Sequence, residues 1–402
     1  MKTVLFVGAG RHQRRAVERA RELGFRVAAV DRNPDAPGLE EADVGAVIDF
    51  TDVTRVAEFG EQAGADGVLT VSADRAVPVV AAVAEALGLP GIGSPTAHLM
   101  THKVAMRRRL GEIGVPQPRF AAVRNLQEGR AALETVGLPA VLKPADSGGQ
   151  RGVFRLDSPD DLELHLYAAL AESSTEEAIV ESFHEGTELN GLVVARDGRA
   201  ELLSLSDRLR PPGIGFGVGW IHVFPSTLAG YPLERAEREA VRAVRALGLR
   251  DGIAFPQLIV SPSGDVRIVE VAARIPGGQM ADLARHAVGV DLVEVALCQA
   301  LGEQVSDSLA RPQRHQPLAI RFLTASPGPL PTGKVLSVDG LERVLAYPGV
   351  VQADVFLTPG ETIRPVRLDG DRRGYVIAVG TTNLEALERA ERAARLLRVE
   401  VA

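Results

Sequence analysis

The sequence is poor in cysteine and in aromatic residues. Its 402 residues contain one cysteine, Cys298, which excludes a disulfide framework and a cysteine-rich zinc site. We interpret Cys298 as a small side chain buried in an apolar segment. Aromatic residues make up 4% of the chain and the formal net charge is −7. We therefore expect no nucleic-acid partner, because such proteins rely on stacking side chains and basic surfaces.

Long hydrophobic runs are also missing. No window holds the roughly 18 uninterrupted apolar residues that indicate a membrane span. The apolar segment Thr3–Val7 is short and leads directly into Gly8-Ala-Gly10, which indicates a first strand and a turn rather than a signal peptide. We therefore expect a cytoplasmic protein with no membrane partner.

Lysine is rare although cationic residues are common. Lysine and arginine total 45, but the only lysines are Lys2, Lys103, Lys143 and Lys334. Arginine serves as the surface cation almost everywhere else. A retained lysine therefore indicates a place where a compact point charge is needed.

Residues 1–93 alternate short apolar strands with helices. The pattern predicts strands at residues 3–7, 26–30, 47–48 and 67–71, and helices at residues 13–23, 53–63 and 76–87. This order is typical of a parallel, doubly wound sheet, so we expect a Rossmann-like N-terminal domain. The stretch Pro90–Pro95 interrupts the pattern, and Thr96 is expected to cap a helix that ends near Gly114.

From residue 119 onward, strands are joined by glycine-rich turns, with helices between them. Strands are expected at residues 120–123, 140–143, 178–181 and 191–194, a hairpin at residues 253–260 and 266–271, and a last helix near residues 383–397. The whole pattern predicts a fold of the α/β and α+β classes, in three parts that cover residues 1–93, 94–310 and 311–402.

The first glycine-rich motif is Gly8-Ala-Gly10-Arg11-His12-Gln13, which follows a strand and opens a helix. A dinucleotide fingerprint has this form, with an acid such as Asp31 at the end of the second strand. Gln13, however, occupies the position of the third glycine. Three interpretations stay open: a nicotinamide or flavin site, a tight turn within the sheet, and contact with a small substrate.

The second motif begins with Lys143 at the end of a predicted strand and continues into a loop of small residues. Glycine lets backbone N–H groups approach phosphate oxygens, and lysine adds positive charge for phosphoryl transfer. A glycine-rich turn beside a strand-end lysine is the simpler alternative. The candidate phosphate-binding residues of the loop are Ser147, Gly148, Gly149, Gln150 and Gly152.

A third segment carries acids at and beyond the end of an apolar strand. Such a segment can offer backbone groups to an adenine edge and a carboxylate to ribose hydroxyls, although an exposed turn has the same composition. The candidate residues are Glu181, Ser182, Phe183, His184 and Glu188.

The predicted hairpin carries a fourth candidate group. Gln257 and Glu270 stand on opposite strands, where both side chains can point to one face and share a Mg²⁺ ion, which prefers oxygen ligands. Arg274 could then reach a phosphate with its planar fork, and Gly277 and Gly278 follow as candidate substrate contacts. The alternative is a hairpin with a surface ion pair.

Taken together and in this order, the segments resemble the ATP-grasp superfamily over nearly the whole chain. The resemblance implies a Rossmann-like pre-ATP-grasp domain at residues 1–93, an ATP-grasp nucleotide-binding region at residues 94–310, and a C-terminal lid at residues 311–402. The segment around Lys103 resembles the family's Asp-Lys pair before a helix, except that His102 replaces the aspartate.

The resemblance also assigns roles to residues. It implies that Lys103 and Lys143 contact ATP phosphates, that the glycine loop folds over them, and that the third segment holds adenine and ribose. Its cofactors are ATP and Mg²⁺, with Mn²⁺ as an alternative metal. The family usually has glutamate where this chain has Gln257 and asparagine where it has Ala272, so the number of metal ions stays open.

Within the superfamily, the sequence looks most like bacterial L-amino acid ligases. Glu270-Val-Ala-Ala-Arg274 and Trp220-Ile-His222-Val-Phe-Pro225 carry this resemblance. It implies that His222 and Arg274 stabilise an acyl-phosphate and the tetrahedral oxyanion, while the alternative for His222 is a core histidine. The substrate-binding acid expected three residues before His222 is replaced by Gly219.

The implied reaction has two steps, for which Lys143, His222 and Arg274 are the predicted catalytic residues. A carboxylate attacks the γ-phosphate of ATP, and an amine then displaces phosphate to form an amide. The expected partners are a small-molecule carboxylate and amine, and a homodimer is compatible with the sequence. A biotin- or purine-type carboxylase that uses bicarbonate, a dinucleotide-binding oxidoreductase and a nucleotide-sensing pseudoenzyme are the alternatives.

Overall fold

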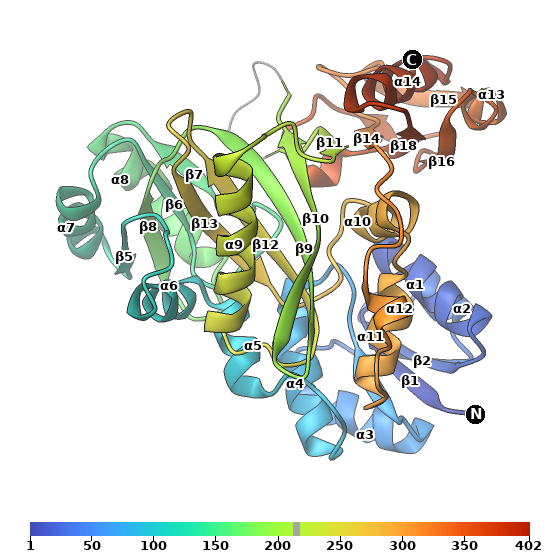
Figure 1. Ribbon diagram of the computed structural model, residues 1–402, viewed down its shortest axis with the longest axis horizontal. Helices are drawn as coiled ribbons and strands as arrows, with labels where there is room; N and C mark the ends of the chain where they lie inside the picture. The colour runs from blue at the N-terminus through green and yellow to red at the C-terminus, as the bar shows by residue number, and fades with distance from the viewer. Residues whose placement is uncertain (212–217) are drawn as a thin grey trace.

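A computed structural model describes residues 1–211 and 218–402, and its architecture confirms the predicted mixture of α/β and α+β structure (Figure 1). Most of the glycine-rich segment before His222, residues 212–217, lies outside the described residues. Among the helices that are described, none is long and apolar enough to cross a membrane.

The N-terminal part is built on the predicted parallel sheet. Its strands follow the order β3-β2-β1-β4 and comprise β1 (Thr3–Val7), β2 (Arg26–Asp31), β3 (Val44–Val47) and β4 (Gly67–Leu69). All five residues of β1 are buried, as expected for a central parallel strand with helices on both faces. The accompanying helices are α1 (Arg11–Glu22), α2 (Pro37–Glu41), α3 (Val53–Ala63) and α4 (Val77–Ala86). The third strand ends at Val47, where the sequence pattern had placed its beginning.

Two helices, not one, follow the first break, so the prediction that Thr96 caps a helix ending near Gly114 was wrong. Helix α5 (Ser94–Thr101) begins after Gly93, whose φ of 78° only glycine adopts easily, and Pro95 lies in its first turn. Helix α6 (Lys103–Glu112) begins after His102, whose Nδ1 accepts the Ala105 N–H at 3.4 Å. The histidine thus caps the helix that carries Lys103.

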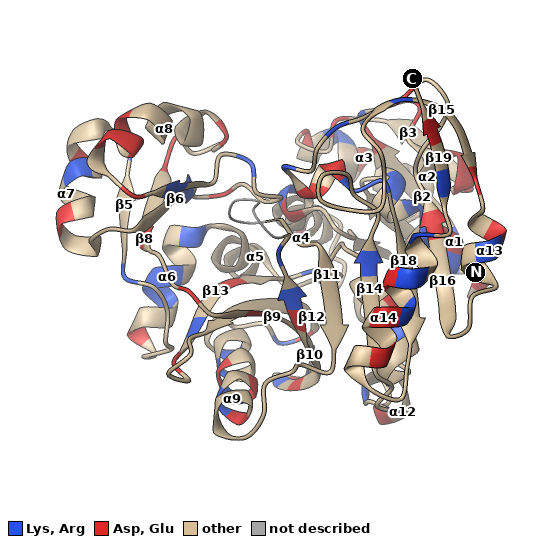
Figure 2. Cartoon of the chain, turned by 90° about the horizontal axis from the view of Figure 1, so that it is seen from above, with Lys and Arg blue, Asp and Glu red and all other residues tan. Residues whose placement is uncertain are grey.

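A small antiparallel sheet forms the next lobe, in the order β5-β8-β6-β7. Its strands are β5 (Phe120–Val123), β6 (Ala140–Pro144), β7 (Phe154–Leu156) and β8 (Ala178–Ser182). Helices α7 (Leu126–Val136) and α8 (Pro159–Ala171) bury their apolar sides against it in a core that includes Leu142, Leu162 and Val180. This lobe stands at one end of the molecule, away from the N-terminal sheet (Figure 1, Figure 2).

An eight-stranded antiparallel sheet connects the two lobes, in the order β13-β12-β9-β10-β11-β14-β18-β16. The strands are β9 (Thr187–Arg196), β10 (Arg199–Leu209), β11 (Ile221–Phe224), β12 (Gly252–Val260), β13 (Val266–Ala272), β14 (Leu318–Phe322), β16 (Val350–Val355) and β18 (Gly374–Val379). The predicted hairpin is confirmed as β12 and β13. Strands from the C-terminal residues therefore continue the sheet that begins in the central region.

Different elements pack on the two faces of the large sheet. Helix α9 (Tyr231–Ala246) packs its small residues Ala236, Ala240 and Ala243 on one face. The other face contributes Leu192 and Phe255 to a core shared with the N-terminal strands and with α10 (Met280–Leu283) and α11 (Leu292–Ala300). Cys298 on α11 is partly exposed, which corrects our interpretation of a buried side chain, because one side of this short helix faces solvent.

Apart from three short helical segments at Asp74–Ala76, Ala284–Val288 and Asp369–Asp371, the remaining elements follow α11 in the chain. They are α12 (Asp307–Ala310), α13 (Leu341–Leu345), α14 (Asn383–Ala394) and a small sheet in the order β17-β15-β19, formed by β15 (Gly333–Asp339), β17 (Thr362–Ile363) and β19 (Arg398–Val401). Acidic and basic residues are interspersed along α7, α9 and α14 in Figure 2. The boundaries of the three predicted parts stay a prediction.

Candidate active site

Lys143 is the second-to-last residue of strand β6 and is held by a buried carboxylate. Its Nζ lies 2.8 Å from Oε2 of Glu181, and Oε1 of the same carboxylate accepts Arg107 Nε at 2.8 Å. Glu181 is opposite Val141 in the β6–β8 ladder, two residues from Lys143, so the two side chains emerge on one face. The three side chains are at most 7% exposed.

The neighbouring charges determine the protonation of Glu181 and Lys143. Burial alone would raise the pKa of Glu181, but Arg107 and Lys143 outweigh it and lower the pKa to about 2. Burial lowers the pKa of Lys143, and Glu181 opposes that change. Glu181, one of the residues expected to hold adenine and ribose, is therefore paired with two cations, and its nucleotide role stays a prediction.

Lys103 stands one helical turn before Arg107 on α6, so both side chains face the same site. Its Nζ donates to the Ser147 carbonyl at 2.7 Å and lies 3.3 Å from Oε1 of Glu270. The structure thus brings together one predicted phosphate-binding lysine, the start of the glycine loop and the predicted metal-binding carboxylate. Lys143 and Lys103 approach the loop from two different elements.

The glycine loop lies against the N-terminal part of the chain. Its turn uses positive φ angles at Gly149, Gln150 and Gly152. A Cβ on Gly148 would stand 2.3 Å from Oδ2 of Asp74, so only glycine fits this close approach. Ser147, at the start of the loop, is buried.

Asp74 is also the partner of Arg274. The guanidinium donates from Nε and Nη2 to the two carboxylate oxygens, at 2.6 and 2.8 Å. Burial would raise the pKa of Asp74, but Arg274 lowers it below its ordinary value, and the pair is therefore charged. Arg274 is held close to the glycine loop by a residue of the N-terminal part that sequence reasoning missed.

The residues predicted to bind adenine and ribose lie on β8, on β9 and between them. Phe183 lies under the guanidinium of Arg155, with 4.3 Å between the guanidinium carbon and the ring centroid, and His184 Nε2 is 2.9 Å from Ser182 Oγ. Glu188 is paired with Arg208 at 2.6 Å and with Arg210 at 2.9 Å. These contacts leave the nucleotide roles of the group a prediction.

Gln257 and Glu270 face each other across the β12–β13 ladder, so their side chains share a face of the large sheet. Within the described residues, no group of three or more His, Cys, Asp or Glu side chains could hold a metal by itself. One carboxylate and one amide oxygen nevertheless suit Mg²⁺, which usually takes few protein ligands and keeps water and substrate phosphates as the others. The pair fits a metal bound together with a nucleotide.

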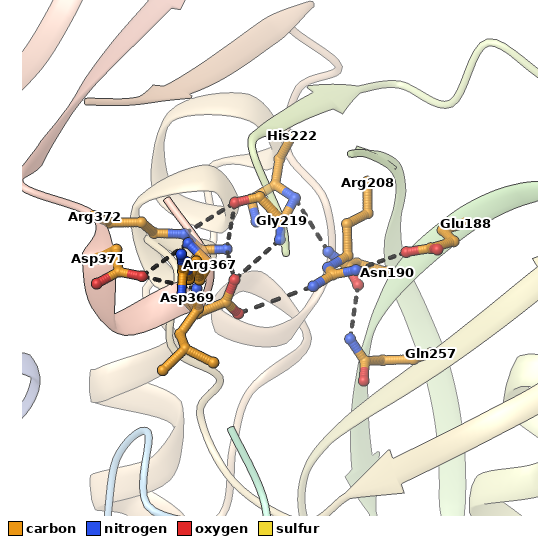
Figure 3. Close-up of polar contacts among 11 residues, drawn as sticks. Glu188, Asn190, Arg208, Gly219, His222, Gln257, Arg367, Asp369, Asp371 and Arg372 are labelled. Atoms are coloured by element: carbon orange, nitrogen blue, oxygen red, sulfur yellow. Dashed lines mark hydrogen bonds and ion pairs between the residues drawn. The ribbon is translucent and has the colours of Figure 1, made fainter. Parts of the chain in front are cut away.

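The same face carries a row of polar side chains toward His222. Asn190 of β9 is opposite Gln257 and also opposite Ser206 of β10, while Arg208 of β10 is opposite His222 of β11. Gln257 Nε2 donates to Asn190 Oδ1 at 3.2 Å, and Asn190 Nδ2 lies 3.2 Å from His222 Nδ1 (Figure 3). The metal-binding candidates and the predicted catalytic histidine are thus connected by one asparagine.

His222 is buried, yet its ring points to the glycine turn. A Cβ on Gly278 would lie 3.4 Å from His222 Nε2 and 3.5 Å from Arg372 Nη1. Burial lowers the pKa of His222 well below 6.5, and Arg372 and Arg208 lower it further. The imidazole is therefore neutral at pH 7. Gly277 packs against Ser72. A Cβ added to Gly277 would lie 3.3 Å from the Ser72 hydroxyl oxygen.

Arg372 and Asp369 reach this end of the site from the C-terminal part of the chain. Arg372 donates to the Gly219 carbonyl at 2.6 and 3.0 Å and to Asp369 Oδ1 at 2.7 Å, and Gly219 N donates to the same Oδ1 at 2.9 Å (Figure 3). A Cβ at Gly219 would meet Arg372 Nη2 at 2.5 Å. Gly219, which replaces the expected acid, thus leaves space for Arg372, and Arg372 is paired with the carboxylate of Asp369.

The first glycine motif is closed by contacts within the chain. Asp31 Oδ2 accepts the Ala9 N–H at 2.9 Å, and Gln13 Nε2 donates to the Val71 carbonyl at 2.6 Å. Gly38 packs on Ala9. A Cβ added to Gly38 would stand 2.6 Å from the carbonyl oxygen of Ala9. Asp31 and Gln13 therefore hold the turn, which favours the structural interpretation over a dinucleotide site.

Comparison with known proteins agrees with this geometry. Family models match in chain order: the ATP-grasp N-terminal domain over residues 17–91, the ATP-binding domain of the carbamoyl-phosphate synthase L chain over residues 102–308, and the L-amino acid ligase C-terminal domain 2 over residues 322–402. The formate-dependent phosphoribosylglycinamide formyltransferase of Ignicoccus hospitalis is 30% identical over 411 residues, which cover 98% of this chain and 95% of that protein.

Solved structures share the fold over the whole chain. The L-amino acid ligase of Bacillus licheniformis superposes with a TM-score of 0.85 at 23% identity and covers 100% of this chain and 99% of its own. The phosphoribosylglycinamide synthetase of Anaerococcus prevotii gives a TM-score of 0.79 at 20% identity, with complete coverage of both chains. The chain therefore belongs to the ATP-grasp family, in its carboxylate–amine ligase branch. It is an ATP-binding, ADP-forming enzyme that makes carbon–nitrogen bonds.

Proposed function

We propose that the chain joins an amino acid, or an amino-acid-like carboxylate, to an amine through an acyl-phosphate, with release of ADP and phosphate. The observation that carries this proposal is the row of side chains on one face of the large sheet, which links the nucleotide residues to His222. The match of residues 322–402 to an L-amino acid ligase domain supports it, because that segment delivers Arg372 and Asp369 to the site.

The first step needs charge at the phosphates. A carboxylate oxygen of the substrate attacks the γ-phosphorus, the bond to the bridging oxygen breaks, and ADP leaves. Lys103 and Lys143 come to this region from α6 and β6, and their role is to neutralise the phosphate oxygens. Arg274, aligned by Asp74, is placed to hold the transferred phosphoryl group or the acyl-phosphate with its fork.

The second step needs a donor for an acyl oxygen. The amine nitrogen attacks the carbonyl carbon, negative charge develops on the oxygen, and phosphate then leaves as the nitrogen loses a proton. A neutral His222 can donate its Nε2 proton to that oxygen, and Arg372 Nη1 faces the same point beside Gly278. Closure of the glycine loop would keep water from the acyl-phosphate.

The proposed metal site uses Gln257 and Glu270. When bound there with the nucleotide, Mg²⁺ would supply positive charge to the phosphate oxygens; Mn²⁺, which accepts similar oxygen ligands, is the alternative. Glu270 contributes the negative charge of the site, while Gln257 contributes an oxygen and leaves its N–H group for Asn190.

The proposal is tested by measuring ADP release with amino acids supplied singly and in pairs, with mass spectrometry of the products. Release that requires two amino acids and yields a dipeptide would support it. Formate and bicarbonate, each with an amine, form the other arms. ADP release that requires bicarbonate or formate with an amine, and none with any pair of amino acids, would assign the chain to carboxylation or formylation instead.

A further inference from the structure

We propose that Asn190 is a positioning residue that keeps the proton of His222 on Nε2, and that Gln257 sets the orientation of the Asn190 amide. The inference rests on the oxyanion role proposed for His222 and adds what makes that role possible. Neither residue needs to touch the substrate carbonyl, since both act through the imidazole.

The three side chains form one chain of hydrogen bonds across three strands. Gln257 Nε2 lies 3.2 Å from Asn190 Oδ1, and Asn190 Nδ2 lies 3.2 Å from His222 Nδ1. Asn190 is 1% exposed and His222 is 3% exposed, so both partners are shielded from bulk water. A buried amide in this position must satisfy its donor and its acceptor within the protein.

The chain of amides has two possible directions, and the proposed metal site selects one of them. A metal cation binds the oxygen of the Gln257 amide and not its nitrogen. The N–H group of Gln257 is then left to donate to Asn190. Asn190 then accepts with Oδ1 and donates with Nδ2, and Nδ1 of His222 must be the acceptor. The imidazole proton consequently resides on Nε2, which faces Gly278.

The charges around the ring exclude the doubly protonated form at neutral pH. Arg208 faces His222 from the neighbouring strand β10, and Arg372 faces it from the segment after Asp369. Phe322 of β14 presents an edge to the imidazole, with centroids 5.3 Å apart at 89°. Burial is the largest cause that lowers the pKa of His222, followed by Arg372 and Arg208. The histidine is therefore a neutral donor with a defined direction.

The position of Nε2 shows where this proton would act. His222 Nε2 and Arg372 Nη1 converge on the volume that a side chain at Gly278 would fill. An acyl oxygen placed there would meet one neutral and one charged donor. With the proton on Nδ1, the same imidazole would present a lone pair to the oxyanion, and the interaction would become repulsive.

Nitrogen-15 NMR of ring-labelled histidine tests the proposal without substrate or turnover. The nitrogen shifts of an imidazole show which nitrogen is protonated, and loss of a signal in His222→Ala assigns the residue. In the parent protein at pH 7 with Mg²⁺ and ADP, Nε2 of His222 should be protonated and Nδ1 should not. In Asn190→Asp, which replaces the donor by a carboxylate of the same size, Nδ1 should become protonated.

A second variant covers the case in which Asn190→Asp fails to fold. Gln257 is only partly buried, and Gln257→Glu removes the donor to Asn190, so the asparagine amide should turn and present Oδ1 to His222. Nδ1 should again gain the proton. Gln352→Glu is the matched control, because Gln352 Oε1 contacts His286 Nε2 at 3.0 Å outside the proposed site. That variant should leave the His222 signals unchanged.

The outcomes separate this inference from the proposed function. Nδ1 protonated in the parent, or no change in both Asn190→Asp and Gln257→Glu, would overturn the role of Asn190 even in an active ligase. The expected proton shift supports it even if no amino acid is a substrate. Where amide formation is measurable, Asn190→Asp should lower it by about 10²-fold or more while ATP affinity is kept, since a wrong tautomer removes the donor without disturbing the nucleotide.

Discussion

The two ends of the site are held together by different kinds of interaction. At the nucleotide end, each cation has a carboxylate: Lys143 with Glu181, and Lys103 with Glu270. At the substrate end, the connecting groups are neutral amides and an imidazole, and the arginines beside the imidazole, Arg208 and Arg372, come from two separate elements. The ion pairs of the nucleotide end hold permanent positive charges in place. The neutral groups of the substrate end can stabilise negative charge that develops during the reaction.

This difference agrees with the two chemical steps proposed for the site. ATP phosphates carry their negative charge before and during the reaction, so preset cations suit them. An oxyanion exists only in the transition state and its intermediate, so a neutral donor that does not bind the ground state strongly is more effective. Variants at the two ends should therefore fail in different ways.

The largest effect is expected at the nucleotide end. Lys143→Ala should lower ADP formation by at least about 10³-fold, because a charge on the phosphates is lost while Glu181 stays buried. Lys334→Ala is a suitable control, since Lys334 is exposed and is one of the few other lysines. A loss of less than threefold in Lys143→Ala, measured as steady-state ADP release, would remove this lysine from the mechanism.

At the substrate end, His222→Ala should separate binding from chemistry. Loss of one oxyanion donor typically costs about 10²–10³ in turnover, so amide formation should fall by that factor while ATP affinity stays near the parent value. Residual ATPase activity should persist, because Lys143, Glu270 and Arg274 are intact. Product formation and nucleotide affinity should both be measured. An equal loss of both, with a lower melting temperature, would identify His222 as a core residue only.

Glu181 offers a test of the ion pairs that does not depend on activity. Its pKa is about 2 in the folded chain against an ordinary value of 4.5. Above pH 4.5 the carboxylate is charged in both states and its stabilisation is complete. As the pH falls from 4.5 to 2, the unfolded chain takes up the proton first, and up to about 3 kcal/mol of stability is lost.

The corresponding variant is Glu181→Gln, examined by urea unfolding across this pH range. It should be less stable than the parent at pH 7, because Lys143 and Arg107 lose a buried partner, and the difference should shrink as the pH falls toward 2. Glu163→Gln removes an exposed pair with Arg130 and should change stability little at any pH. A difference that does not depend on pH would contradict the depressed pKa.

The sequence singled out the lysines of the nucleotide end more readily than the arginine contributed by the C-terminal part, for physical reasons. Lysines are rare in this chain, so Lys103 and Lys143 were easy to single out. A glycine-rich loop can also be recognised from a short stretch of sequence alone. Arg372 could not be distinguished among many arginines, and Asp369 meets Gly219 across 150 residues of chain. Asp74 pairs with Arg274 across 200 residues. Such pairs depend on the packing of separate parts.

Some errors had local causes. Thr96 has the right side chain for a cap, but Gly93, with its positive φ, caps the helix three residues earlier. The strand that ends near Glu181 was predicted correctly, and the nucleotide role of this segment stays a prediction, but the local pattern could not show that Arg107 on another element pairs with the Glu181 carboxylate. Gly219 in place of the expected acid was noticed in the sequence, but that position alone could not show that Asp369 lies beside it.

The smallest effect on ADP formation, in a variant that also couples the two ends, is expected from Gln257→Glu. A second carboxylate opposite Glu270 should lower the Mg²⁺ concentration for half-maximal ADP formation, by roughly tenfold, because charge count sets the affinity of such sites. The same change removes the donor to Asn190 and should slow amide formation. A metal titration of ADP release and of amide product should therefore show the two curves moving apart. Gln352→Glu provides the control, with both curves unchanged. If the Mg²⁺ requirement of Gln257→Glu matches that of the parent, the glutamine is no metal ligand, and the orientation of Asn190 needs a different cause.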